Sequence, residues 1–129
     1  MSGRYLLDTD IVIPLLNGER SVRLALENTE KTFLSAISVG ELYFGAAKSG
    51  RPEANRVLID DFLRHRIVLA CNSAVAREYG RIKSLLKGQG TPLPENDIWI
   101  AATALHHKLI LVSRDQHFRA IAELTTVRW

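Results

Sequence analysis

Apolar residues recur along this chain in two alternating patterns, short unbroken runs and helical stripes. The clearest example lies between Pro94 and Asp115. Apolar residues there occupy the i, i+3, i+4 and i+7 positions of one helical face, namely Ile98, Ala101, Ala102 and Leu105. An unbroken apolar run follows at 109–112, which is typical of a strand covered on both faces. This stretch therefore predicts a helix with Asp97 in its first turn, followed by a buried strand.

The rest of the chain repeats this alternation. Short apolar runs predict further strands at 4–7, 32–35 and 67–69, and an edge strand at 125–127. Helical spacing predicts helices at 11–17, 21–28, 38–48, 53–64 and 73–87, and a last short helix at 116–121. Strands that alternate with helices are typical of α/β folds with a mainly parallel sheet, here of four to five strands. No repeat or linker interrupts the pattern, so we expect one domain over residues 1–129.

Polar residues at three helix starts predict caps. Thr9 or Asp10 would cap the helix that begins at Ile11. Ser38 and Glu41 have the spacing of a capping box. Either Asn72 or Ser73 would cap the long helix that follows the third strand.

Composition narrows the class of protein. The 129 residues are 47% hydrophobic and 24% charged, as in globular domains. No apolar run approaches the roughly 20 residues of a membrane span, and the N-terminal residues lack a signal-peptide pattern. Cys71 is alone, which excludes an internal disulfide and fits a reducing cytoplasm. The net charge of +3 is only weakly informative about a nucleic-acid partner.

Four carboxylates occupy corresponding places in the predicted elements: Asp8, Glu41, Asp97 and Asp115. Each has an ordinary explanation, because acidic residues are favoured in the first turns of helices. In a parallel sheet, however, these places meet at one edge, where like charges would repel one another. No lysine or arginine is adjacent in sequence to the first three, and only Arg114 adjoins Asp115. A hard divalent cation would relieve the repulsion, since Mg²⁺ and Mn²⁺ prefer oxygen ligands.

Four segments in order resemble the PIN-domain nucleases, and within them the VapC toxins of toxin–antitoxin pairs. The segments are Leu7–Asp10, Ser38–Leu42, Asn96–Ala104 and Leu111–Phe118, and they extend over essentially the whole chain. The resemblance implies a three-layer α/β/α fold and an endoribonuclease that depends on Mg²⁺ or Mn²⁺. A metal-activated water would hydrolyse the RNA phosphodiester without needing the 2′-hydroxyl as nucleophile.

The same resemblance implies roles for particular residues. The catalytic set would be Asp8, Glu41, Asp97 and Asp115, with Asp8, Asp97 and Asp115 as metal ligands. Ser113, Arg114 and Thr9 would position the substrate. The implied partners are an RNA substrate such as tRNA or another structured RNA, a VapB-like antitoxin, and a second copy of the chain. An apolar groove between the helices at 11–28 and 53–64 and the aromatic pair Tyr43–Phe44 would hold a helix of the antitoxin.

The same residues also fit other classes of protein. Asp8 and Asp10 fit the first motif of haloacid-dehalogenase-like phosphohydrolases, in which Asp8 would be a covalent nucleophile. A phospho-receiver-like module or a non-catalytic PIN domain would also contain an acidic pocket. Asp10 is interpreted mainly as a helix cap, and His117 either as a surface residue or as a contact to substrate.

Overall fold

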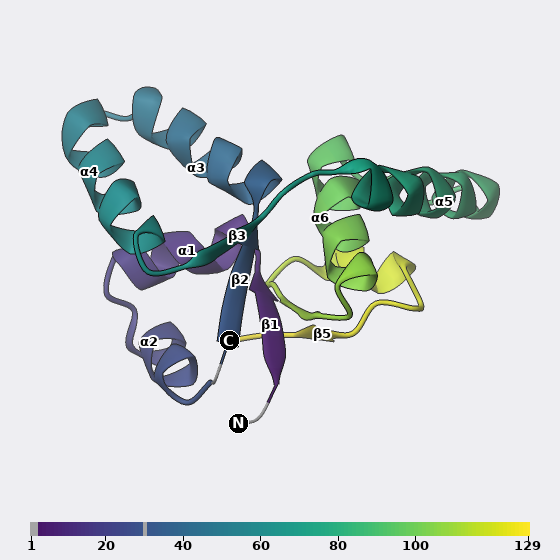
Figure 1. Cartoon of the computed structure of the whole chain (residues 1–129), viewed down its shortest axis with the longest axis horizontal. Coiled ribbons are helices and arrows are strands. Elements are labelled where there is room, and N and C mark those ends of the chain that lie inside the picture. The colour runs from purple at the N-terminus through teal and green to yellow at the C-terminus, as the bar shows by residue number, and fades with distance from the viewer. Residues whose placement is uncertain (1–2, 30) are drawn as a thin grey trace.

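The computed structural model describes residues 3–29 and 31–129. These residues form one parallel sheet of five strands in the order β3-β2-β1-β4-β5 (Figure 1). The strands are β1 (Arg4–Leu7), β2 (Lys31–Ser35), β3 (Ile67–Leu69), β4 (Ile110–Val112) and β5 (Thr126–Val127). The predicted α/β class and the parallel sheet are therefore confirmed, with β5 at one edge as expected.

Helices cover both faces of the sheet and make the fold three-layered. Helices α1 (Thr9–Leu16), α2 (Arg20–Glu27), α3 (Ala36–Ala47) and α4 (Pro52–Leu63) lie on one side (Figure 1). Helices α5 (Ser73–Gln89) and α6 (Glu95–His106) and the short 3₁₀ helix η1 (Gln116–Ala120) lie on the other. Among the described residues, no helix has both the length and the apolar character that crossing a bilayer requires.

The apolar side chains of the central strands divide between two cores. In β1, Leu6 packs toward α5 and α6, whereas Tyr5 and Leu7 pack toward α1–α4. In β4, Leu111 and Val112 divide in the same way. Successive side chains of a strand point to opposite faces, so an unbroken apolar run supplies both cores.

The order of the strands reverses between β1 and β4, because β2 and β3 extend to one side of β1 and β4 and β5 to the other. In open α/β sheets, ligands bind outside the carboxyl ends of the strands at such a switch point. Leu7 pairs with Val112, so Asp8 and Ser113 leave the two strands side by side. The backbone N–H of Asp8 donates to the Val112 carbonyl at 2.9 Å, which extends this pairing by one residue.

Several predicted element starts were wrong by one or two residues, and two of these errors changed the assigned helix cap. Helix α1 begins at Thr9 rather than Ile11, and its cap is Asp8 rather than Thr9 or Asp10. Helix α3 is capped by Ser35, whose hydroxyl accepts the N–H of Ser38, so Ser38 is inside the helix and does not form a capping box. Strand β4 begins at Ile110, one residue late. Asn72, one of two predicted candidates, caps α5.

Candidate functional site

Asp8 and Ser113 form the floor of an acidic site at the ends of β1 and β4. The Ser113 hydroxyl donates to Asp8 Oδ2 at 2.8 Å, and the backbone N–H of Thr9 donates to Asp8 Oδ1 at 2.8 Å. Asp8 is only 6% exposed, and Ser113 is equally buried. Burial raises the pKa of Asp8 to about 7, although the hydrogen bond from Ser113 lowers it in part. The surroundings of Asp8 therefore disfavour its charged form, and its hydrogen bonds compensate for this only in part.

Asp97 and Asp115 face each other beside this floor. Asp97 is in the first turn of α6, and Asp115 caps η1 directly after β4. Together with His117 they offer ligand atoms that lie within 4.8 Å of one another. Burial is the main cause that raises the pKa of Asp97 to about 6, and the charges of Asp115 and Glu41 raise it further. The two aspartates therefore repel each other across a short distance.

Glu41 lies at the margin of the site, on the second turn of α3. Its Oε1 accepts the Thr9 hydroxyl at 2.7 Å, and its Oε2 accepts the Asn96 side-chain amide at 3.3 Å. Thr9 follows Asp8 at the start of α1, and Asn96 precedes Asp97 in α6. Both helices therefore orient the Glu41 carboxylate. Thr9 was predicted as a site residue, whereas Asn96 was not, and its one sequence signal was its position next to Asp97.

Cationic side chains do not neutralise this site. Within the described ranges, no lysine or arginine forms an ion pair with Asp8, Glu41, Asp97 or Asp115; Asp115 pairs only with His117, at 3.2 Å. The guanidinium of Arg114, which we expected to contact substrate, instead pairs with Glu19 and donates to the Trp129 carbonyl at 3.1 Å. The four carboxyl groups therefore meet in the folded chain without a lysine or arginine paired to any of them among the described residues.

Asp10 belongs to this region as well, which corrects its interpretation as a helix cap. It is the second residue of α1, and its Oδ2 accepts the backbone N–H of Arg114 at 3.0 Å. The other oxygen, Oδ1, is buried and has no hydrogen-bond partner in the part of the chain that the structure describes. Burial also raises the pKa of Asp10. No sequence signal distinguished this arrangement from capping, because both place an acidic residue in a first helical turn.

These residues fit a hard divalent cation. The carboxylate oxygens are the preferred ligands of Mg²⁺ and Mn²⁺. Two ligands of one Mg²⁺ lie at most about 4.2 Å apart, twice the usual metal–oxygen distance, so side chains within 4.8 Å need little adjustment to share one ion. The raised pKa values and the orphaned oxygen of Asp10 are features that a bound cation would relieve.

The fold and the site together define an α/β domain with an unneutralised acidic pocket at the switch point of a parallel sheet. A family model, described as PIN domain, matches residues 5–124, and the chain belongs to this family. Ribonuclease VapC2 of Haemophilus influenzae is 40% identical over 129 residues, and the match covers 98% of each chain. The tRNA(fMet)-specific endonuclease VapC of Shigella flexneri is 34% identical, again over 98% of each chain.

Solved structures show the same architecture. The DNA-bound VapBC complex of Salmonella typhimurium contains a chain that superposes with a TM-score of 0.92 at 29% identity, over 98% of each chain. A DNA-bound VapBC2 complex of Rickettsia felis gives a TM-score of 0.91 at 27% identity, also over 98% of each chain. The resemblance inferred from four short segments therefore extends over the whole chain, and the predicted family is confirmed.

Two of the alternative functions do not fit this chain. A haloacid-dehalogenase-like phosphohydrolase would belong to another family, whereas the family model that matches residues 5–124 is the PIN domain. A receiver-like module would have the strand order 2-1-3-4-5, whereas this sheet has the order 3-2-1-4-5. Family membership also argues against a receiver-like module.

Proposed function

We propose that this chain is a Mg²⁺-dependent endoribonuclease and the toxin of a toxin–antitoxin pair. The observation that carries the proposal is the meeting of Asp97 and Asp115 beside buried Asp8, with no lysine or arginine paired to them among the described residues. The names of the relatives, which include ribonucleases and a tRNA(fMet)-specific endonuclease, support RNA as the substrate. A structured RNA such as tRNA is therefore the first substrate class to test.

Asp8, Asp97 and Asp115 would hold the cation, with His117 beside them. When bound, Mg²⁺ or Mn²⁺ lowers the pKa of water and stabilises negative charge that develops on a phosphodiester. Ser113 keeps Asp8 in place and also accepts the backbone N–H of Asp115 at 3.0 Å, so one hydroxyl orients two of the three carboxylates.

Glu41 has a different role in this proposal. It stands outside the group that could share one ion, and the side chains of Thr9 and Asn96 hold it at the margin of the site. A carboxylate oriented in this way can accept a proton from the attacking water. Thr9 thus acts by positioning Glu41, and Arg114 reaches substrate phosphate only if its contact with Glu19 opens.

The proposed activity is tested by replacing Asp97 with Asn, which preserves the shape of the side chain and removes its charge. We expect Asp97→Asn to abolish cleavage of RNA in the presence of Mg²⁺, and EDTA to abolish cleavage by the unmodified protein, while circular dichroism shows a folded chain. Asp61→Asn is the matched control, because Asp61 is exposed on α4 and pairs only with Arg64. Full activity of Asp97→Asn, or activity in EDTA, would refute the assignment.

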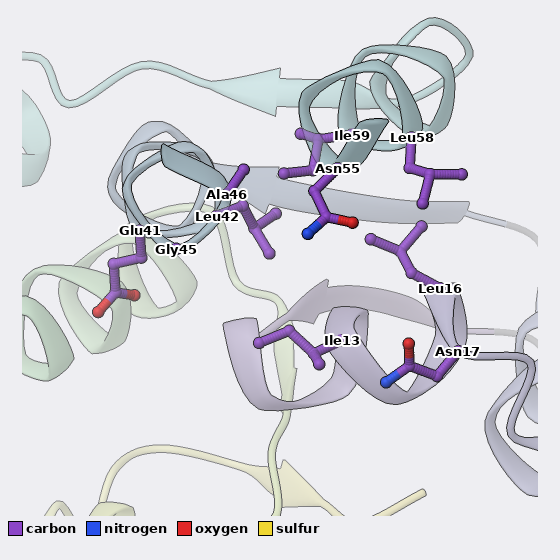
Figure 2. A pocket seen from close by; sticks show the side chains of 10 residues that line it. All are labelled: Ile13, Leu16, Asn17, Glu41, Leu42, Gly45, Ala46, Asn55, Leu58 and Ile59. Atoms are coloured by element: carbon purple, nitrogen blue, oxygen red, sulfur yellow. The ribbon is translucent and has the colours of Figure 1, made fainter. Parts of the chain in front are cut away.

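The partner in this proposal is a VapB-like antitoxin, which fits an apolar groove on the side of α1, α3 and α4. The groove has a volume of about 230 Å³ and is lined mainly by Ile13, Leu16, Leu42, Leu58 and Ile59. Figure 2 shows Leu16 and Leu58 facing each other across it, with Glu41 at one end. An apolar helix in this groove would lead directly to the acidic site, where a basic residue could follow it. Structures of VapBC complexes among the neighbours support this partner.

Assembly of the chain with a second copy also stays a proposal, based on the family resemblance. Light scattering of the purified protein would measure the molecular mass directly, and a monomer at all concentrations would contradict it.

A further inference from the structure

The turn between β4 and η1, residues 113–117, carries Ser113, Asp115 and His117 into the site. The N–H of Ser113 donates to the Val127 carbonyl at 3.0 Å, and Arg128 donates to the Arg114 carbonyl at 3.0 Å, whereas side chains accept the N–H groups of residues 114, 115 and 117. The N–H of Asp115 donates to the Ser113 hydroxyl at 3.0 Å, and the N–H of His117 donates to Asp115 Oδ1 at 2.9 Å. The N–H of Arg114 donates to Asp10 Oδ2 at 3.0 Å. Of these three side-chain acceptors, Asp10 alone comes from outside the turn, from a helix 104 residues earlier in the chain.

Asp10 is suited to this contact by its place on α1. Its Oδ2 also lies 3.3 Å from the Ser113 hydroxyl, but that hydroxyl has one proton and is closer to Asp8, at 2.8 Å. The firm bond of Asp10 is therefore the one to the Arg114 backbone. The guanidinium of Arg114 is directed to Glu19 and the Trp129 carbonyl, so the contact does not depend on that side chain.

We propose that Asp10 is a positioning residue, which fixes the turn after β4 through the Arg114 N–H and thereby sets where Asp115 faces Asp97. The role needs an oxygen acceptor at this place and does not need a negative charge. It deepens the proposed function, because it concerns the geometry of the same cation site. The hydrogen bond from the Arg114 N–H to Asp10 can also be tested without metal or RNA, because it lies within the chain.

Two variants of Asp10 separate the acceptor from the charge. Asp10→Asn keeps an oxygen that accepts the Arg114 N–H, whereas Asp10→Leu has a similar size and no acceptor. We expect exchange of the Arg114 amide proton, measured by NMR in EDTA, to be about tenfold faster in Asp10→Leu, as for the loss of one hydrogen bond, and nearly unchanged in Asp10→Asn. The Val75 amide, held by Asn72, is the internal reference.

Metal binding gives the second readout. Calorimetric titration with Mn²⁺ should show an affinity about tenfold weaker for Asp10→Leu, because Asp115 is no longer held in place, and an affinity within about threefold of the unmodified protein for Asp10→Asn. If Asp10→Asn binds Mn²⁺ as weakly as Asp10→Leu, the charge of Asp10 is what matters and the proposal is wrong. It is also wrong if Asp10→Leu exchanges and binds normally.

These outcomes are separate from the fate of the proposed function. A protein that binds Mn²⁺ and shows the expected exchange pattern, but cuts no RNA, would refute the nuclease assignment and leave the role of Asp10 intact. Asp10→Ala replaces Asp10→Leu if the leucine prevents folding. The Asp10→Asn result on its own still decides between acceptor and charge.

Discussion

The most informative single residue is Asp8, because its burial opposes its charge. A carboxyl with 6% exposure would normally be neutral or paired with a cation, yet the partners of Asp8 among the described residues are a hydroxyl and one backbone N–H. Its pKa near 7 means that the metal-free site binds a proton that a divalent cation would displace. Burial of the Asp8 carboxylate thus lowers the stability of the metal-free protein and favours binding of a divalent cation.

This cost has a defined pH dependence. The folded state binds the Asp8 proton more tightly than the unfolded chain does, with pKa values of about 7 and 3.8, so the contribution of Asp8 to the free energy of unfolding falls as the pH rises from about 4 to about 7. Asp8→Asn removes that contribution. In EDTA, we expect the variant to gain stability over the unmodified protein by roughly 2 to 3 kcal/mol more at about pH 8 than at about pH 5.

Urea denaturation of both proteins at the two pH values measures this difference. If the difference in stability between the two proteins did not change with pH, the pKa of Asp8 would not be raised in the folded protein. Added Mn²⁺ should reverse the order at about pH 8, since it stabilises only the protein that retains the ligand.

At the residue scale, the sequence identified the aspartates and glutamate of the site but not everything that orients them. Asp8, Asp97 and Asp115 were predictable because each lies at the end of a strongly apolar element. Asn96 and Asp10 were not, because their partners Glu41 and Arg114 are 55 and 104 residues away in the chain. Contacts of that kind leave no periodic or local signal.

At the scale of elements, apolar periodicity located every helix and strand, and the errors lie at the ends. Ser38 has the spacing of a cap, but β2 ends at Ser35 and the chain turns directly into α3, so the earlier serine takes the role. Because Ser35 caps the helix, Glu41 does not take part in a capping box, and its carboxylate accepts the Thr9 hydroxyl instead. Short polar stretches offer several equivalent caps, and the position of the preceding strand decides among them.

The choice of cap residue can be tested at helix α5. Its cap is Asn72, whose side chain accepts the N–H of Val75 at 3.1 Å, although Ser73 was an equal candidate from sequence. We expect Asn72→Ala to lower the free energy of unfolding by about 1 kcal/mol, the usual value of a lost N-cap. Ser73→Ala should change it by no more than a few tenths, because Ser73 is already inside the helix.

Thermal and urea unfolding of the two variants provide the measurement. Asp or Ser at position 72 should restore most of the loss, since either accepts the same N–H. Equal losses for the two alanine variants would place the cap elsewhere.

At the scale of the whole molecule, the apolar groove and the acidic site are neighbours because α1 and α3 take part in both. Glu41 lines the groove and contacts Thr9, while Leu42 on the same helix packs in the core beneath it. Phe44, one of the two aromatics expected to border the groove, is 66% exposed and is not among the residues that line it. A partner that fills the groove would therefore also control access to the site.

The groove is tested with Leu58, which is 50% exposed on α4 and lines it. Leu58→Asp should weaken binding of the VapB-like antitoxin by at least about tenfold, because a charge would be buried in an apolar interface, and should leave the fold intact. Leu85→Asp is the matched control, since Leu85 is 45% exposed on α5, away from this groove.

Binding is measured by isothermal titration with the antitoxin, and RNA cleavage in its presence gives a second readout. If Leu58→Asp and Leu85→Asp bind alike, the antitoxin docks on another face of the molecule.

The sequence by itself determined the α/β class, the parallel sheet and the acidic residues of the site, because these follow from local periodicity and from side chains at element ends. The tertiary structure decided what only distant contacts can set: that β4 pairs with β1, that Asp10 holds the turn after β4, and that Arg114 turns to Glu19 rather than to the acids. The physical reason is that periodicity reports which face of an element is buried, whereas the neighbours on that face depend on how the whole chain packs.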